Sequence, residues 1–262
     1  MDVAERSRGD ELLIERYEYK YLVPERLLPA IRAAARATCR IDKNAGPDGI
    51  YAIRSLYFDT RGYDLFWAND REAAVRFKVR ARAYPGAASS PVFLEVKNRE
   101  RDVIVKTRAA VPAASWRRVL DCEGRALAEL SPQSRKGAIA FAGKVHAHHL
   151  EPTLLVEYER EAYVSDVDVY GRLTFDRRIQ AQPRTRLDLE ADPRRWRDID
   201  HPVRTITGEP VTVLELKFEG RAPAWMSALV RRLELHRASF SKYCYGIGEQ
   251  NARPALRTAV WP

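Results

Sequence analysis

The sequence is poor in cysteine and has no long apolar run. Its 262 residues include three cysteines, Cys39, Cys122 and Cys244, which lie far apart. An odd number of scattered cysteines predicts neither a disulfide framework nor a zinc site, so we expect a reducing compartment, the cytoplasm. No apolar run approaches the roughly 18 residues that a membrane helix needs. The mixed charges of residues 1–6 predict no secretory signal.

Backbone loops that cradle phosphate are also missing. Only 13 residues are glycine, and neither G-x-x-x-x-G-K-[ST] nor G-x-G-x-x-G occurs. We find no Ser/His/Asp or Cys/His arrangement of the kind that nucleophilic catalysis uses. Any phosphate site in this chain must therefore be built from side chains.

Positive charge, by contrast, is abundant. The chain has 45 Lys and Arg against 36 Asp and Glu, a net charge of +9. This excess predicts attraction to a polyanion such as nucleic acid, a nucleotide, polyphosphate or anionic lipid, without choosing among them. No loose segment has the character of a linker, so we predict a single domain over residues 12–248.

Hydrophobic periodicity predicts an α+β fold. At least eight strands are expected, at about residues 13–22, 51–59, 74–84, 92–99, 102–110, 153–164, 171–179 and 211–219. Helices are expected at residues 24–38, 112–130, 132–149 and 223–236. Because turns join most of the strands, we predict an antiparallel tunnel or barrel of about eight strands, with a basic lumen and helices packed outside.

The strands alternate apolar with charged residues. One face of residues 75–82 is apolar, and the other carries Arg76, Lys78, Arg80 and Arg82. A single wet sheet face explains any one such strand, but seven strands repeat the pattern. In a closed sheet these cations would repel each other unless an anion bound or water remained among them. The pattern therefore predicts a ligand with several adjacent negative charges, such as a chain of phosphates.

The charged faces supply candidate site residues. The candidate phosphate ligands are Arg16, Lys20, Lys78, Arg80, Arg82, Lys97, Lys106, Arg108, Arg160, Arg172 and Lys217, with Tyr158 on the same face as Arg160. Four acids lie among them, Glu18, Glu95, Asp176 and Glu215. These carboxylates either balance charge in ion pairs or hold a divalent cation, Mn²⁺ or Mg²⁺, against phosphate oxygens.

Eight short motifs occur in an order that resembles a known family. They are Arg16-x-Glu18-x-Lys20-Tyr21, Ser55-x-Tyr57-Phe58-Asp59, Arg80-x-Arg82-x-Tyr84, Glu95-x-Lys97, Tyr158-x-Arg160, Leu173-Thr174-Phe175-Asp176, Leu214-Glu215-x-Lys217 and Ser239-Phe240-Ser241-Lys242-Tyr243. Together they resemble the VTC domain, the polyphosphate polymerase domain of the vacuolar transporter chaperone complex. That domain is one of the triphosphate tunnel metalloenzymes, alongside the CYTH proteins.

The resemblance implies an antiparallel tunnel in which the γ-phosphate of ATP is transferred to a growing polyphosphate chain with a divalent metal such as Mn²⁺. Carried over by motif, the phosphate-binding residues would be Lys20, Arg80, Arg82, Lys97, Arg160 and Lys242. Tyr158 would hydrogen-bond a phosphate and Glu215 would hold the metal. Ser241, beside Lys242 in the last motif, is a further candidate substrate contact.

Two positions depart from related patterns. CYTH proteins carry E-x-E-x-K on the first strand, and Arg16 in the first position favours the VTC branch. Ser239 stands where the eukaryotic polymerases have a lysine, so that phosphate contact is either missing or supplied by another residue, such as Arg237. We expect no counterpart of the phosphate-sensing and membrane domains of the eukaryotic complex, so export of the product would need a membrane-protein partner on a separate chain, which would associate this protein with the inner membrane.

Other functions stay open at the level of sequence. The same tunnel could act as a nucleotide or inorganic triphosphatase, or as a non-catalytic module that binds polyphosphate or nucleotide. Specific nucleic-acid binding is least favoured, because the cations share one sheet face and no exposed aromatic platform accompanies them.

Overall fold

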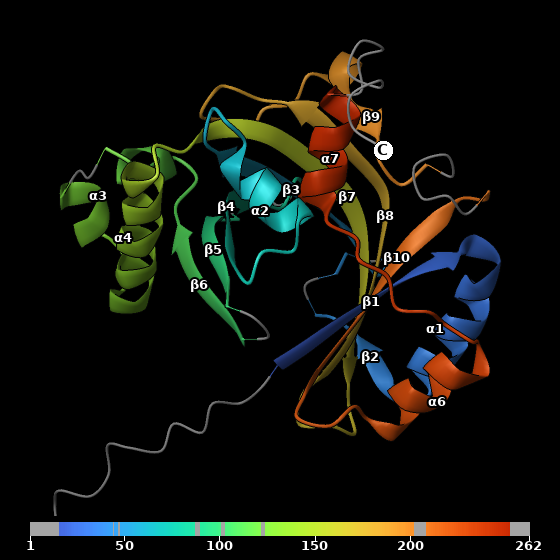
Figure 1. Cartoon of the computed structure of the whole chain (residues 1–262). Coiled ribbons are helices and arrows are strands. Elements are labelled where there is room, and N and C mark those ends of the chain that lie inside the picture. The colour runs from blue at the N-terminus through green and yellow to red at the C-terminus, as the bar shows by residue number, and fades with distance from the viewer. Residues whose placement is uncertain are drawn as a thin grey trace, which may run out of the picture.

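The computed structural model describes residues 16–251 apart from 44, 47, 87–89, 101–102, 122–123 and 202–207. One antiparallel sheet dominates this part of the chain (Figure 1). Its strands are β1 (Arg16–Pro24), β2 (Cys39–Ile41), β3 (Ile50–Asp59), β4 (Val75–Ala83), β5 (Val92–Glu100), β6 (Val103–Val111), β7 (Glu151–Ser165), β8 (Gly171–Pro183), β9 (Arg197–Asp198) and β10 (Val211–Glu219). All eight predicted strands are present, and the short β2 and β9 are additional.

The sheet runs in the order β1-β10-β8-β7-β3-β4-β5-β6, while β2 pairs with β7 and β9 with β8. In the described residues β1 and β6, the two ends of this path, are not hydrogen-bonded to each other. The sheet nevertheless curls enough for Lys97 of β5 to reach Glu18 of β1, at 3.2 Å between Nζ and Oε2. The predicted α+β fold with an antiparallel tunnel-like sheet is confirmed, and the sheet is open along one side.

Six helices are described: α1 (Leu28–Arg36), α2 (Asp64–Asp70), α3 (Gly124–Ala128), α4 (Pro132–Ala147), α6 (Ala224–Arg232) and α7 (Lys242–Asn251). Short 3-10 turns are η1 (Glu25–Leu27), η2 (Trp116–Val119) and η3 (Pro193–Arg195). The prediction of a single helix over residues 112–130 is wrong. That segment forms η2 and α3 instead, and α3 begins at Gly124, a poor helix former. The sequence analysis did not predict α2 and α7.

Two apolar cores lie on the outer face of the sheet. Under α4, Phe141 packs against Val79 and Leu94 of β4 and β5. Under α1 and α6, Ile31 and Met226 pack against strands β1, β8 and β10. Figure 1 shows α3 and α4 at one end of the sheet and α1 and α6 at the other. The apolar residues at every second strand position are thus buried beneath these helices.

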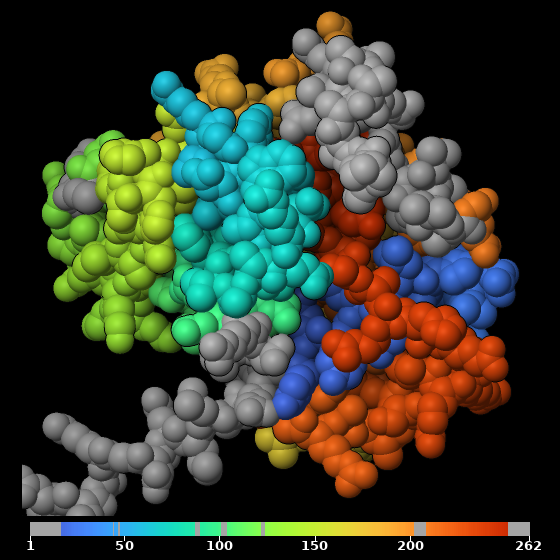
Figure 2. Space-filling model, in the orientation of Figure 1, coloured from blue at the N-terminus to red at the C-terminus, as the bar shows by residue number. Residues whose placement is uncertain are grey.

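The third core lies on the opposite, lumen-facing side. Tyr243 and Ile247 of α7 pack there with Ile53, Val156 and Ile179 of the sheet. Helix α7 also contacts α2, and Figure 2 shows these two elements side by side on one face of the molecule. The lumen is therefore apolar beneath α7 and charged beyond it, and α7 brings its first residue, Lys242, to the boundary.

Candidate functional site

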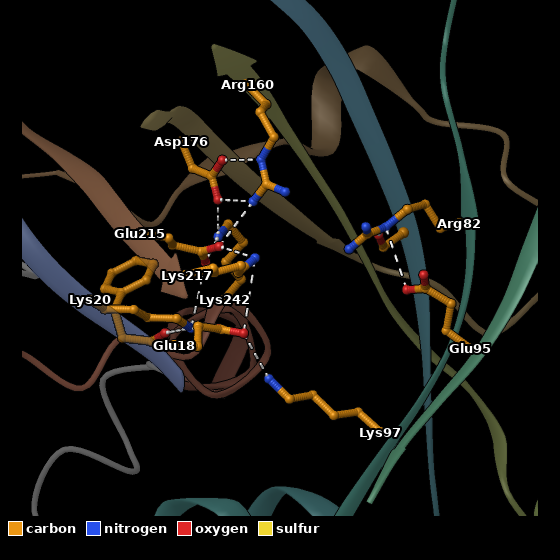
Figure 3. Close-up of polar contacts among 12 residues, drawn as sticks. Glu18, Lys20, Arg82, Glu95, Lys97, Arg160, Asp176, Glu215, Lys217 and Lys242 are labelled. Atoms are coloured by element: carbon orange, nitrogen blue, oxygen red, sulfur yellow. Dashed lines mark hydrogen bonds and ion pairs between the residues drawn. The ribbon is translucent and has the colours of Figure 1, made fainter. Parts of the chain in front are cut away.

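Glu215 of β10, which is only 4% exposed, and six charged side chains around it form one cluster. We call them the Glu215 cluster: Glu18, Lys20, Arg160, Asp176, Glu215, Lys217 and Lys242 (Figure 3). Glu215 Oε2 lies 2.9 Å from Lys217 Nζ and 3.3 Å from an Arg160 nitrogen. Its Oε1 lies 3.7 Å from Lys20 Nζ and 3.6 Å from Lys242 Nζ. Four cations thus surround one buried carboxylate.

Strand register explains why these residues meet. Lys20 stands directly opposite Glu215 and Glu18 opposite Lys217 in the β1–β10 pair. Arg160 stands opposite Asp176 in the β7–β8 pair. Directly opposed residues of an antiparallel pair lie on the same face with their Cβ atoms close together, so the strand alternation itself assembles most of the cluster.

Asp176 anchors two of the cations. Its side chain is fully buried and accepts hydrogen bonds from Arg160, at 2.6 Å and 2.7 Å, and from Lys242 Nζ at 2.5 Å. Burial would raise the pKa of Asp176, but Arg160 and Lys242 hold it below its ordinary value. Burial would likewise lower the pKa of Lys242, but Asp176 and Glu215 raise it. All three groups are therefore charged at neutral pH.

A second group of cations lies around Glu95 of β5. We call this the Glu95 cluster: Glu95, Arg80, Arg82, Lys106 and Arg108. Figure 3 shows Arg82 and Glu95 apart from Glu215, on another part of the sheet. The structure therefore does not place Glu95 with the other three carboxylates that the sequence analysis grouped as metal ligands.

Three lysines form a row that includes Lys106 of the Glu95 cluster and reaches Glu18 of the Glu215 cluster through Lys97. Lys78 is paired in register with Lys97, and Lys97 with Lys106, across β4, β5 and β6. Burial, together with the nearby Lys20, Lys97 and Arg80, lowers the pKa of Lys78 to about 7, although Cys244 opposes the shift. Partial burial, together with the nearby Arg80 and Arg82, lowers the pKa of Lys106 to about 8 despite its partner Glu95. Like charges directly opposite each other destabilise a sheet, so this row favours a bound polyanion.

Four further residues were predicted as site residues, and the structure places them differently. Ser241 accepts a hydrogen bond from Lys78 Nζ at 3.0 Å and so lies in the site. The ring of Tyr158 lies under Arg160 and Lys242, with Lys242 Nζ 4.6 Å from its centroid. Arg172, by contrast, pairs with Asp42. The side chain of Arg16 lies outside the described part of the structure.

Arg237 does not replace the lysine that is missing at position 239. Its guanidinium lies 3.7 Å from the centroid of the Tyr19 ring. Tyr19 alternates with Glu18 and Lys20 along β1, so it points to the opposite, outer face of the sheet. The expectation that Arg237 supplies this phosphate contact is therefore not supported by its position.

Three groups that support the cations have no role assigned to them from the sequence. The hydroxyl of Tyr57 accepts a hydrogen bond from Arg80 at 3.0 Å, and Ser55 Oγ accepts one from Arg82 at 3.5 Å. Both stand opposite these arginines in the β3–β4 register, and the order of the motifs along the chain does not specify that register. The carbonyl of Phe240 accepts a hydrogen bond from Lys20 Nζ at 2.9 Å, and no side-chain pattern signals such a contact.

Two of the carboxylates lie where they could hold a divalent cation whose remaining ligands would be phosphate oxygens and water. In the described residues, no group of three or more His, Cys, Asp or Glu is arranged to hold a metal ion. Glu18 and Glu215, however, both contact the ammonium groups of Lys20 and Lys217. Mg²⁺ usually takes only one or two carboxylates and completes its shell with phosphate oxygens and water. Glu18 and Glu215 are therefore the pair that could hold it.

Comparison with known proteins is consistent with this geometry. A family model described as the VTC domain matches residues 15–249. The chain belongs to the VTC domain family. Since the cationic lumen is what this fold presents to a ligand, membership and geometry together support a phosphate-related function. No curated protein matches the sequence.

Several solved structures are distantly similar to this member of the VTC family. One, a candidate adenylate cyclase from Bacillus halodurans, has 11% identity and a TM-score of 0.47, with 87% of this chain and 96% of that one covered. Another, a candidate adenylyl cyclase from Hippeastrum whose description reports a dominant triphosphatase activity, has 14% identity and a TM-score of 0.45, with coverages of 88% and 95%. Both likenesses are too distant to transfer an activity. No helix in the described part of the chain is long and apolar enough to cross a membrane.

Proposed function

We propose that this protein is a metal-dependent polyphosphate polymerase that transfers the γ-phosphate of ATP to a growing polyphosphate chain. The observation that carries the proposal is the Glu215 cluster, in which four cations and three carboxylates share one largely buried site. Phosphoryl transfer needs chiefly positioning and charge stabilisation rather than covalent chemistry from the protein. This cluster supplies both.

In this proposal each residue has a distinct task. Lys20, Arg160, Lys217 and Lys242 bind the triphosphate oxygens, and Asp176 holds Arg160 and Lys242 in position. A divalent cation held by Glu18 and Glu215 would neutralise phosphate charge. The lysine row of Lys78, Lys97 and Lys106 would bind further phosphates of the chain.

The test is to incubate purified protein with ATP and Mn²⁺, and to resolve the products on a gel stained for polyphosphate while ADP and free phosphate are measured. A polyphosphate ladder with a matching amount of ADP supports the polymerase. Neither a ladder nor ADP, with binding of tripolyphosphate retained, would instead leave a non-catalytic binding module.

Site variants make the test specific. We expect Lys242→Ala and Glu215→Gln each to lower turnover by about 10²-fold, the usual effect of removing one transition-state contact. Arg178→Ala is the matched control, because the Arg178 side chain is 77% exposed and pairs with Glu159 on the surface. Equal turnover in all three variants would reject the Glu215 cluster as the active site.

A triphosphatase is the second candidate, and one observation favours it. β1 and β6 are not hydrogen-bonded to each other in the described residues, and the side chains of Lys106 and Arg108 near that opening are each 42% exposed. Water can therefore reach the charged face. Release of ADP and free phosphate without a ladder would identify hydrolysis as the activity.

A further inference from the structure

Glu95 is buried among four cations, and in the described residues none of these forms an ion pair with Glu18 or Glu215. The residue is 1% exposed. Its Oε2 lies 2.7 Å from Arg80 and 3.8 Å from Arg82, and its Oε1 lies 2.6 Å from Lys106 and 3.5 Å from Arg108. Both oxygens are thus committed to cations, and the pKa of this carboxyl is far below its ordinary value because Arg80, Arg82 and Lys106 outweigh the effect of burial.

Each of the three arginines has a second partner besides Glu95. Arg80 also donates a hydrogen bond to the Tyr57 hydroxyl, and Arg82 donates one to Ser55. The Arg108 guanidinium lies 3.6 Å from the centroid of the Phe93 ring, where a cation is attracted to the aromatic face. Each guanidinium therefore has a second partner that holds it, and what Glu95 alone supplies is one negative charge.

A phosphate would compete with that charge. Phosphate and carboxylate oxygens both accept paired hydrogen bonds from guanidinium groups, so a ligand phosphate that enters the Glu95 cluster meets cations already partly neutralised. Without Glu95, four neighbouring cations would repel one another in the empty protein. Glu95 therefore stabilises the empty tunnel and weakens the attraction of any anion for it.

We propose that Glu95 is an internal counter-anion that lowers the affinity of the tunnel for polyphosphate ligands and so allows them to be released. The inference takes its ligand class from the proposed function. It differs from a positioning role, in which loss of Glu95 would disorder the arginines and weaken binding. The two roles therefore predict opposite changes in affinity.

The experiment is a calorimetric titration of the protein with inorganic tripolyphosphate, without nucleotide or metal. We expect Glu95→Gln to bind at least about tenfold more tightly than the wild type, since one charge within about 4–6 Å shifts an ionic equilibrium by at least that factor. The melting temperature of the ligand-free variant should fall, and tripolyphosphate should raise it by more than it raises that of the wild type.

Glu161→Gln is the matched control. Glu161 is also buried, at 7% exposure, and pairs with Arg32 of α1 on the outer face, 2.8 Å away. Its loss should lower the melting temperature and leave the affinity for tripolyphosphate unchanged. Unchanged or weaker binding by Glu95→Gln, or no binding by the wild type, overturns the proposal.

Glu95→Asp provides a second test in case the glutamine variant does not fold. Aspartate keeps the negative charge, but its side chain is one methylene shorter, so the carboxylate lies farther from the arginines. If Glu95 acts as a counter-anion, the affinity of this variant for tripolyphosphate should stay within about twofold of the wild type. Markedly weaker binding would indicate positioning instead. Because neither titration contains ATP or metal, a protein that makes no polymer but shows these affinity changes refutes only the proposed polymerase.

Discussion

Asp176→Asn is the substitution that most directly tests how the Glu215 cluster is held together. The change preserves the shape of the side chain and removes one buried negative charge. Among the described residues, Arg160 and Lys242 would then keep Glu215 as their one shared carboxylate partner. The cluster would change from four cations and three carboxylates to four cations and two.

The expected cost follows from the burial of these groups. Asp176 is 0% exposed, and the side chains of Arg160 and Lys242 are 11% and 8% exposed. Removing one partner of a buried ion pair typically costs about 3–5 kcal/mol, because the remaining charge stays buried and uncompensated. For a domain of this size each kcal/mol lowers the melting temperature by about 2–4 °C. We therefore expect a decrease of about 6–20 °C.

Urea denaturation of the wild type and the variant measures this cost. Glu159→Gln is the control, because it breaks the exposed pair with Arg178 and should cost about 0–1 kcal/mol. Adding Lys242→Met to Asp176→Asn removes one of the stranded cations and should recover part of the loss. If Asp176→Asn costs less than about 1 kcal/mol, then Arg160 and Lys242 are hydrated in the folded protein and the reasoning is refuted.

Three further predictions test other parts of the structure. Affinity for tripolyphosphate should fall as the pH rises above about 7, because the pKa of Lys78 is lowered to about 7 and the neutral amine no longer attracts phosphate; titrations of Lys78→Arg, which stays charged, should show a flatter pH profile. Gly137→Ala should lower the free energy of unfolding by about 1–3 kcal/mol, since an added Cβ would lie 2.6 Å from the carbonyl oxygen of Arg108. An unchanged melting temperature would show that α4 can move away from β6 without cost. Asp59→Ala should lower the free energy of unfolding by about 1–3 kcal/mol or more, because Asp59 is buried and accepts hydrogen bonds from two N-terminal amides of α2 and from Tyr243 of α7. Chemical denaturation measures this loss, and an unchanged stability would refute the link between the two helices.

Much of the fold could be predicted from the sequence, because strand alternation is a local property. The period of two in residues 75–82 determines that Arg80 and Arg82 share a face whatever the strand pairs with. The apolar pattern of residues 223–236 likewise predicts α6. Helix α7 was missed because two of its residues are glycine, a poor helix former, and its buried face carries Lys242 and Gly246 rather than a row of apolar side chains.

The sequence by itself determined the family, the antiparallel strands and the set of charged residues that face the lumen. Only the tertiary structure decided which of these charged residues belong to the Glu215 cluster and which to the Glu95 cluster. Strand order places Glu215 beside β1 and β8 and places Glu95 between β4 and β6, so two acids with similar sequence surroundings lie in separate clusters. Contacts such as Lys97 with Glu18 join residues far apart in the chain. They depend on the curvature of the whole sheet, which no local pattern encodes.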